Sequence, residues 1–151
     1  MLDLVKSKFL LADDDSDDAD IFCEILTSIE SSIECLTVGN GRDVFELLSK
    51  GDNYRPDVIF IDINMPIMNG WECLRTLKSD PGYNDIPTVI YSTSSAKTDI
   101  ETAYNLGASF FLCKPEDLEE LHQILEIVAT APQTVLLKRL AGFKSVKLVS
   151  N

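Results

Sequence analysis

Polar side chains stand at the ends of four short apolar runs, each rich in residues that favour β-strands. Carboxylates follow two of the runs, a hydroxyl follows the third and an ammonium follows the fourth. Side chains of these types can together hold a divalent metal ion and a phosphoryl group. They are Asp13 and Asp14 after Lys8–Ala12, Asp62 after Val58–Ile61, Ser92 after Thr88–Tyr91, and Lys114 after Phe110–Cys113.

The carboxylates come without a neighbouring His or Cys, so they form an all-oxygen donor set that suits Mg²⁺ rather than zinc or copper. A carboxylate can also be the nucleophile of aspartyl-phosphate chemistry. We therefore expect Asp62 to be the nucleophile, with Asp13 and Asp14 holding the metal. Lys114 would pair with one phosphoryl oxygen and Ser92 would donate a hydrogen bond to another.

Taken singly, each of these residues has a plainer interpretation. A strand-end Asp or Ser commonly caps the following loop, and a single Lys is commonly a surface cation. The acidic run Asp13–Asp18 also resembles the first turn of a helix, where carboxylates are favourable. The phosphoryl-site interpretation depends on these residues occurring together at the ends of neighbouring strands.

Helical periodicity between the strands predicts how the sheet is built. A further strand is expected at Ile33–Val38, which gives five strands that alternate with five helices. Such alternation predicts an α/β fold, a doubly wound (βα)5 parallel sheet with helices on both faces. The expected helices cover about Asp17–Glu30, Val44 to near Gly51, Trp71–Leu77, about Thr98–Leu106 and Leu118–Val128.

Length and composition predict one soluble domain. The chain has 151 residues, and 45% of them are hydrophobic, which suits a single core. A net charge of −12 argues against direct DNA binding. No apolar run is long enough for a bilayer, and residues 1–6 lack the apolar stretch of a secretion signal, so we expect a cytoplasmic protein without membrane contact.

The four cysteines show no metal-binding or redox spacing. Cys23, Cys35, Cys73 and Cys113 are scattered, with no C-x-x-C pair and no His cluster. We therefore expect reduced and mostly buried thiols.

Four separated motifs, in matching order and spacing, resemble the receiver domain of bacterial two-component response regulators. The resemblance implies a flavodoxin-like sheet of strand order 2-1-3-4-5 and a receiver domain at residues 6–131. The motifs are Leu11-Ala12-Asp13-Asp14-Asp15, Phe60-Ile61-Asp62-Ile63-Asn64-Met65-Pro66-Ile67-Met68-Asn69-Gly70, Ser92 five residues after Pro87, and Lys114-Pro115.

The resemblance also implies specific roles. Asp62 would accept a phosphoryl group from a sensor histidine kinase or a histidine phosphotransfer protein. Asp14, Asp62 and the backbone carbonyl of Asn64 would ligate Mg²⁺ directly, and Asp13 through water. The protein would catalyse only phosphorylation and dephosphorylation of its own Asp62, so it would not otherwise be an enzyme.

A switch pair and an unusual peptide bond are further implications of the resemblance. Ser92 would move toward the phosphoryl group, and Phe111 would then turn inward. Ser92 stands where the family more often has Thr, which keeps the hydroxyl. The Lys114–Pro115 bond would be cis, a form that X-Pro bonds tolerate.

Residues 132–151 are too few for an output domain such as a helix-turn-helix, so the resemblance points to a stand-alone receiver that signals to an unknown downstream protein. This basic and apolar tail carries a net charge of +4 from four Lys or Arg residues. It could be a helical extension packed on the body, a homodimer contact, a partner-binding segment or a partly ordered tail.

Two rival functions stay open at this point. A haloacid-dehalogenase-like phosphatase also uses a strand-end Asp as nucleophile, but such enzymes carry Asp-x-Asp where this chain has Asp62 and Asn64. A degenerate receiver that only binds partners would lack phosphorylation, although every expected site residue is present.

Overall fold

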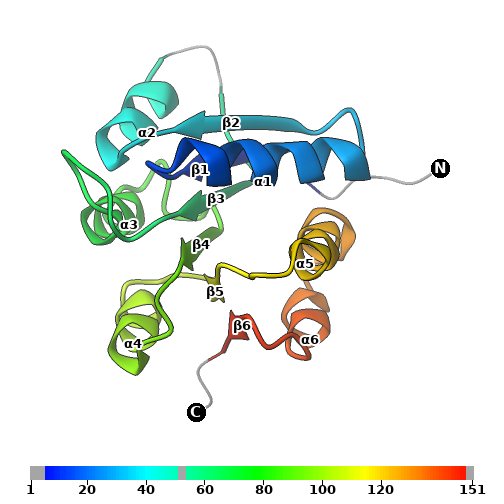
Figure 1. The fold of residues 1–151 in the computed structure, drawn as a ribbon. Coiled ribbons are helices and arrows are strands. Elements are labelled where there is room, and N and C mark those ends of the chain that lie inside the picture. The colour runs from blue at the N-terminus through cyan, green and yellow to red at the C-terminus, as the bar shows by residue number, and fades with distance from the viewer. Residues whose placement is uncertain (1–5, 51–53, 149–151) are drawn as a thin grey trace.

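Five parallel strands form most of the sheet, and four of them come from apolar runs that are buried almost throughout, whereas the strand at the edge is partly exposed. The computed structural model describes residues 6–50 and 54–148. Within them the parallel strands lie side by side in the order β2-β1-β3-β4-β5, as predicted (Figure 1). They are β1 (Lys8–Ala12), β2 (Glu34–Val38), β3 (Val58–Ile61), β4 (Thr88–Ser92) and β5 (Phe110–Cys113).

Five helices connect or follow these strands and cover both faces of the sheet. Figure 1 shows α2, α3 and α4 on one face, with α1 and α5 on the other. Helix α1 begins at Ser16, one residue earlier than predicted, because the Asp15 side chain accepts hydrogen bonds from the backbone of Asp17 and Asp18. The helices are α1 (Ser16–Ile29), α2 (Gly41–Leu48), α3 (Gly70–Ser79), α4 (Lys97–Asn105) and α5 (Leu118–Thr130).

The sheet separates two apolar cores. Alternate residues of each strand point to opposite faces, so Phe60 faces α1 and α5 while Ile59 and Ile61 face α2, α3 and α4. Phe22 of α1 packs edge-on against Phe60, with ring centroids 5.0 Å apart. The predicted doubly wound α/β architecture is confirmed.

The tail adds structure that the sequence interpretation left open. Residues Leu136–Leu140 form α6, and Val146–Lys147 form β6, which pairs antiparallel with β5. The sheet therefore has six strands within the described residues, not five. Leu136, Leu140 and Val146 are buried in the core on the α5 side, so burial of these apolar side chains fixes the tail. Of the alternatives for the tail, the structure shows an extension packed on the body over residues 136–147.

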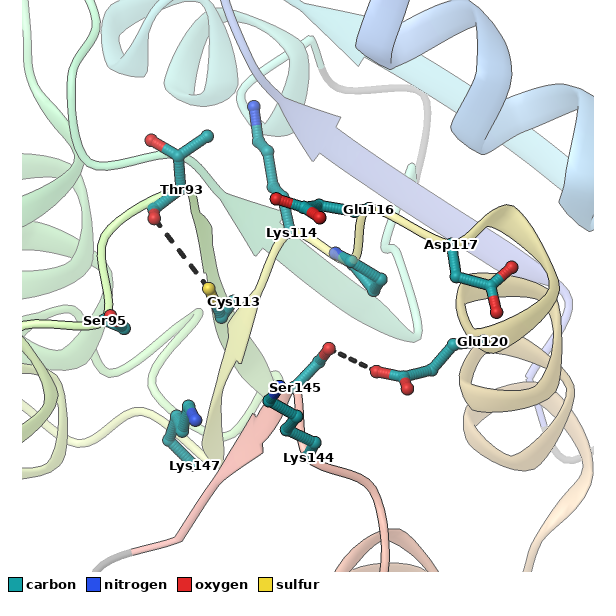
Figure 2. A pocket seen from close by; sticks show the side chains of 11 residues that line it. Thr93, Ser95, Cys113, Lys114, Glu116, Asp117, Glu120, Lys144, Ser145 and Lys147 are labelled. Carbon is teal, nitrogen blue, oxygen red and sulfur yellow. Dashed lines mark hydrogen bonds between the residues drawn. The ribbon is translucent and has the colours of Figure 1, made fainter.

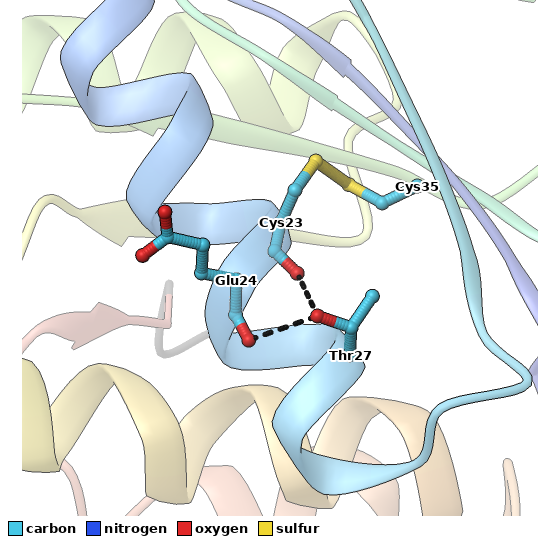
Figure 3. The surroundings of a disulfide bond; sticks show 4 residues. All are labelled: Cys23, Glu24, Thr27 and Cys35. Carbon is cyan, nitrogen blue, oxygen red and sulfur yellow. Dashed lines mark hydrogen bonds between the residues drawn. A yellow bond between two sulfur atoms is a disulfide. The ribbon is translucent and has the colours of Figure 1, made fainter.

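The expectation of four reduced cysteines is wrong for two of them. Cys23 of α1 and Cys35 of β2 form a disulfide, with Cα atoms 5.6 Å apart (Figure 3). The two residues are 12 positions apart in sequence, and they meet because α1 packs beside the strand that follows it. Cys73 is a buried free thiol and Cys113 a partly buried one.

Two smaller expectations also have an outcome. The Lys114–Pro115 bond is trans and not cis, as no described peptide bond is cis; trans is the lower-energy form where nothing imposes cis. None of the helices in residues 6–50 and 54–148 combines the length and apolar character needed to cross a bilayer. The end of the second expected helix near Gly51 and the absence of a signal in residues 1–5 fall outside the described residues.

The disulfide should stabilise the fold measurably. Closing a loop of this length constrains the unfolded chain, so reduction or a Cys23→Ser/Cys35→Ser change should lower the free energy of unfolding by about 3 kcal/mol. Urea denaturation with and without dithiothreitol measures this. Cys113→Ser is the matched control and should change stability little. Alkylation of all four cysteines in the unreduced, denatured protein would show that the bond does not form.

Candidate functional site

The carboxyl ends of the parallel strands bring the expected residues to one edge of the sheet. The backbone N–H of Asp62 donates to Ala12 O at 2.8 Å, so Asp62 sits beside Asp13. The N–H of Lys114 donates to Ser92 O at 2.7 Å, which places Lys114 beside the end of β4. In open α/β sheets this edge is where ligands bind.

Three carboxylates converge at this edge. Asp13, Asp14 and Asp62 each offer an oxygen, and these oxygens lie within 4.8 Å of one another. Asp13 and Asp62 are buried and Asp14 is exposed. Asp13 is oriented by the Asp15 N–H, which donates to its Oδ1 at 2.9 Å. The cluster is therefore a partly open, all-oxygen site of the kind that Mg²⁺ or a similar hard cation prefers.

Lys114 supplies the positive charge of the site. Its Nζ lies 2.8 Å from Asp13 Oδ2, 2.9 Å from Asp18 Oδ2 and 3.6 Å from Asp62 Oδ2. It also lies 5.3 Å from the ring centroid of Tyr91, within cation–π range. Burial disfavours the ammonium, but hydrogen bonds to Asp13 and Asp18 outweigh it and raise the pKa of Lys114.

Asp18 is the site residue that the sequence analysis missed. We assigned it to the first turn of α1 as a favourable charge near the helix N-terminus. In the structure its carboxylate also accepts from Lys114, 96 residues away. Its position three residues after the Asp15 cap could have indicated this role. The first turn of α1 begins at the same edge of the sheet as Asp13, so a carboxylate in that turn can reach the site.

Crowding makes Asp62 an unusual carboxylate. Burial raises its pKa to about 6, Lys114 opposes that rise, and the negative charge of Asp13 adds to it. The carboxylates therefore carry more negative charge than Lys114 balances within the described residues. A divalent cation between the three oxygens would relieve this repulsion, so the donor set fits a bound metal.

The loop after Asp62 is held close by Gly70. A Cβ atom at Gly70 would lie 2.1 Å from the carbonyl oxygen of Asp62, so only glycine fits without moving the loop. Asn69 caps α3 in a capping box with Glu72, which fixes the helix start beside this contact. Asn64 lies in the same loop and is exposed.

The expected switch residues lie on adjacent strands. Ser92 is buried at the end of β4, and its Oγ accepts a hydrogen bond from Ser94 N–H at 3.1 Å. Phe111 is fully buried on β5 beside Ile90 of β4. Phe111 is therefore already inward in this structure, and the predicted link between its position and Ser92 stays a prediction.

A cavity of about 490 Å³ opens beside the site, between the β4–α4 and β5–α5 loops and the β6 segment (Figure 2). Ser145 donates to Glu120 across it, and Lys144 and Lys147 line its lower side. Figure 2 shows the Lys114 side chain pointing away from these two lysines. The tail thus forms one wall of the space next to the acidic cluster.

Comparison with known proteins identifies the family. Residues 9–126 match the response regulator receiver domain. The chain is 30% identical over 121 residues to a chemotaxis protein CheY homolog of Campylobacter jejuni, covering 80% of this chain and 91% of that protein. It is 36% identical over 129 residues to a protein-glutamate methylesterase/protein-glutamine glutaminase of Halalkalibacterium halodurans, covering 80% of this chain but only 36% of that protein.

Solved structures agree with this assignment. The phosphorylated cyanobacterial phytochrome response regulator RcpA superposes with a TM-score of 0.75 at 29% identity, covering 89% of this chain and 96% of that one. The Mn²⁺-bound form of response regulator Rcp1 gives 0.70 at 25% identity, covering 95% and 99%. The chain belongs to the response regulator receiver domain family, and the protein is a phosphorylatable switch of two-component signalling. The dehalogenase-like phosphatase alternative is set aside.

The raised pKa of Asp62 predicts a pH-dependent stability. Between its ordinary value of 3.8 and about 6 the folded state binds the extra proton, so stability falls as pH rises through this window. Without metal, Asp62→Asn should therefore be more stable than wild type by roughly 1–3 kcal/mol at about pH 7.5. The difference should vanish below about pH 4. Urea denaturation in EDTA tests this, with exposed Asp20→Asn as control. The same difference in unfolding free energy between Asp62→Asn and wild type at high and at low pH would contradict the prediction.

Proposed function

We propose that Asp62 is the phosphoacceptor of this receiver. The observation that carries the proposal is the pairing of a buried strand-end carboxylate with an ammonium 3.6 Å away and two further carboxylates within 4.8 Å. This set contains a nucleophile, a cation for the phosphoryl oxygens and donors for a metal. Mg²⁺ would be held by Asp14, Asp62 and the Asn64 carbonyl, and by Asp13 through water.

The chain's own residues suit transfer from a phosphohistidine. An oxygen of Asp62 attacks phosphorus, the new P–O bond forms as the P–N bond breaks, and the imidazole leaves. Lys114 keeps its proton, since its pKa is raised, and can turn from Asp18 toward the phosphoryl oxygens. Bound Mg²⁺ would neutralise charge on those oxygens.

Phosphorylation would change the site chiefly through charge. The added group brings more negative charge and new acceptor oxygens, which favour closer approach by Lys114 and by the Ser92 hydroxyl. Ser92 and Phe111 lie on neighbouring strands, so a shift at Ser92 can reach the β4–α4–β5 surface. That surface would present the signal to a downstream protein, or to a second copy in a homodimer.

The remaining parts of the proposal follow from this role. The donor would be a sensor histidine kinase or a histidine phosphotransfer protein in the cytoplasm. We propose no enzymatic activity other than phosphorylation and dephosphorylation of Asp62, although the matched methylesterase carries a further region beyond its receiver-like part. A partner-binding role for the tail of residues 132–151 is also part of the proposal, because Lys144, Ser145 and Lys147 of the tail line the site cavity.

Phosphorylation at Asp62 can be tested directly. Acetyl phosphate with Mg²⁺ should add the mass of one phosphoryl group to wild type and to Asp20→Asn, an exposed carboxylate on α1. Asp62→Asn should gain none, because the nucleophile is removed. Intact-mass spectrometry reads the result. No gain by folded wild type would favour a degenerate receiver, and continued labelling of Asp62→Asn would move the site elsewhere.

The switch pair needs a different measurement. Beryllofluoride with Mg²⁺ should shift amide resonances near Asp62 and at Phe111 in wild type and in Ser92→Thr, which retains the hydroxyl. In Ser92→Ala the shifts near Asp62 should remain and those at Phe111 should shrink, because the hydrogen-bonding group is lost. Two-dimensional NMR reports both regions in one spectrum. Equal Phe111 shifts in all three proteins would exclude Ser92 as the link.

A further inference from the structure

A second cavity lies at the opposite end of the sheet from Asp62. Its volume is about 160 Å³, and it is bordered by the beginnings of β3, β4 and β5, the end of α5, and α6. Its apolar wall is almost fully buried. The buried apolar wall residues are Val58, Val89, Phe110, Val128 and Leu136, and the rest of the lining includes the polar residues Ser109 and Gln133.

Lys6 gives this apolar cavity a charged group. The residue lines the cavity and is only 4% exposed. Its Nζ is buried, and among residues 6–50 and 54–148 it has no hydrogen-bond partner. The backbone holds the residue in place, because Lys6 N–H donates to Ala129 O at 3.1 Å.

The acidic group whose charge acts on Lys6 makes no ion pair with it among the described residues. Asp57 Oδ2 accepts from the backbone N–H groups of Ser7 and Lys8, at 2.8 and 2.9 Å. Asp57 therefore raises the pKa of Lys6 only through its charge, and burial outweighs that and lowers the pKa. A buried amine without a partner is costly unless an anion joins it.

We infer that this cavity binds a small monocarboxylate with an apolar body, whose carboxylate pairs with Lys6. The apolar wall disfavours strongly hydrated anions such as inorganic phosphate. An aliphatic or aromatic body can instead fill the empty space and make van der Waals contacts with the wall. An apolar cavity of about 150 Å³ holds one benzene-sized molecule. Benzoate and hexanoate therefore have the right size and charge.

The tail helix α6 also borders the cavity, so a bound ligand would contact both α6 and the sheet. Leu136 is buried against the core, while Leu137 of the same helix lines the cavity and is partly exposed. A ligand body between α6 and the sheet would add contacts to both, so binding should stabilise the docked α6.

The test uses the full chain and sodium hexanoate. 1-Hexanol serves as an uncharged probe with a carbon chain of the same length. Hexanoate should raise the melting temperature of wild type in a concentration-dependent way, and methyl shifts in NMR should cluster at Val58, Val89 and Leu136. Lys6→Met removes the charge and keeps the stem, so its affinity for hexanoate should fall about tenfold or more. Hexanol should bind both proteins equally.

Lys97→Met makes the same change at an exposed lysine on α4 and should bind hexanoate like wild type. Lys6→Met loses a buried, unpartnered charge and should stay folded, which the melting curve itself reports. Three results would each overturn the inference: equal hexanoate affinity in wild type and Lys6→Met, shifts that cluster away from the cavity, or no binding to the folded wild type.

Discussion

The site depends on one electrostatic constraint, which is that three carboxylates share the space around a single ammonium. Lys114 Nζ lies closest to Asp13 and Asp18, and Asp62 is the most distant of the three carboxylates. Asp62 is thus left near positive charge without being neutralised by it. The proposed role of Asp62 as nucleophile requires that balance, because a tight ion pair with Lys114 would occupy the oxygens that would attack phosphorus.

The fold creates this constraint by ending β1, β3 and β5 at one edge of the sheet, where α1 also begins. Backbone hydrogen bonds set the heights of Asp13 and Asp62 along the sheet, and the cap at Asp15 turns α1 so that Asp18 returns to the same edge. Gly70 lets the next segment pass directly over the Asp62 carbonyl. Small backbone features therefore decide where the charges lie.

Most of the fold and the central site could be predicted from the sequence, since strong local signals carry them. The apolar runs that precede Asp13, Asp62 and Lys114 are strong signals for strands. In a parallel sheet the carboxyl ends of the strands lie at the same edge. Asp18 and the Cys23–Cys35 bond were missed because each depends on how α1 lies against other elements. Strand β6 was missed because two residues, Val146 and Lys147, give no periodicity to detect.

Strand β6 changes the edge that the sheet presents to other chains. An open strand edge offers unpaired N–H and C=O groups to other chains. In the described residues the sheet ends on one side in β6, a strand of only two residues, and on the other side in β2. Strand β2 is the one tied to α1 by Cys35. The edge that β5 would otherwise present is thus replaced by a shorter one, and the edge strand on the other side is held to α1 by a covalent bond.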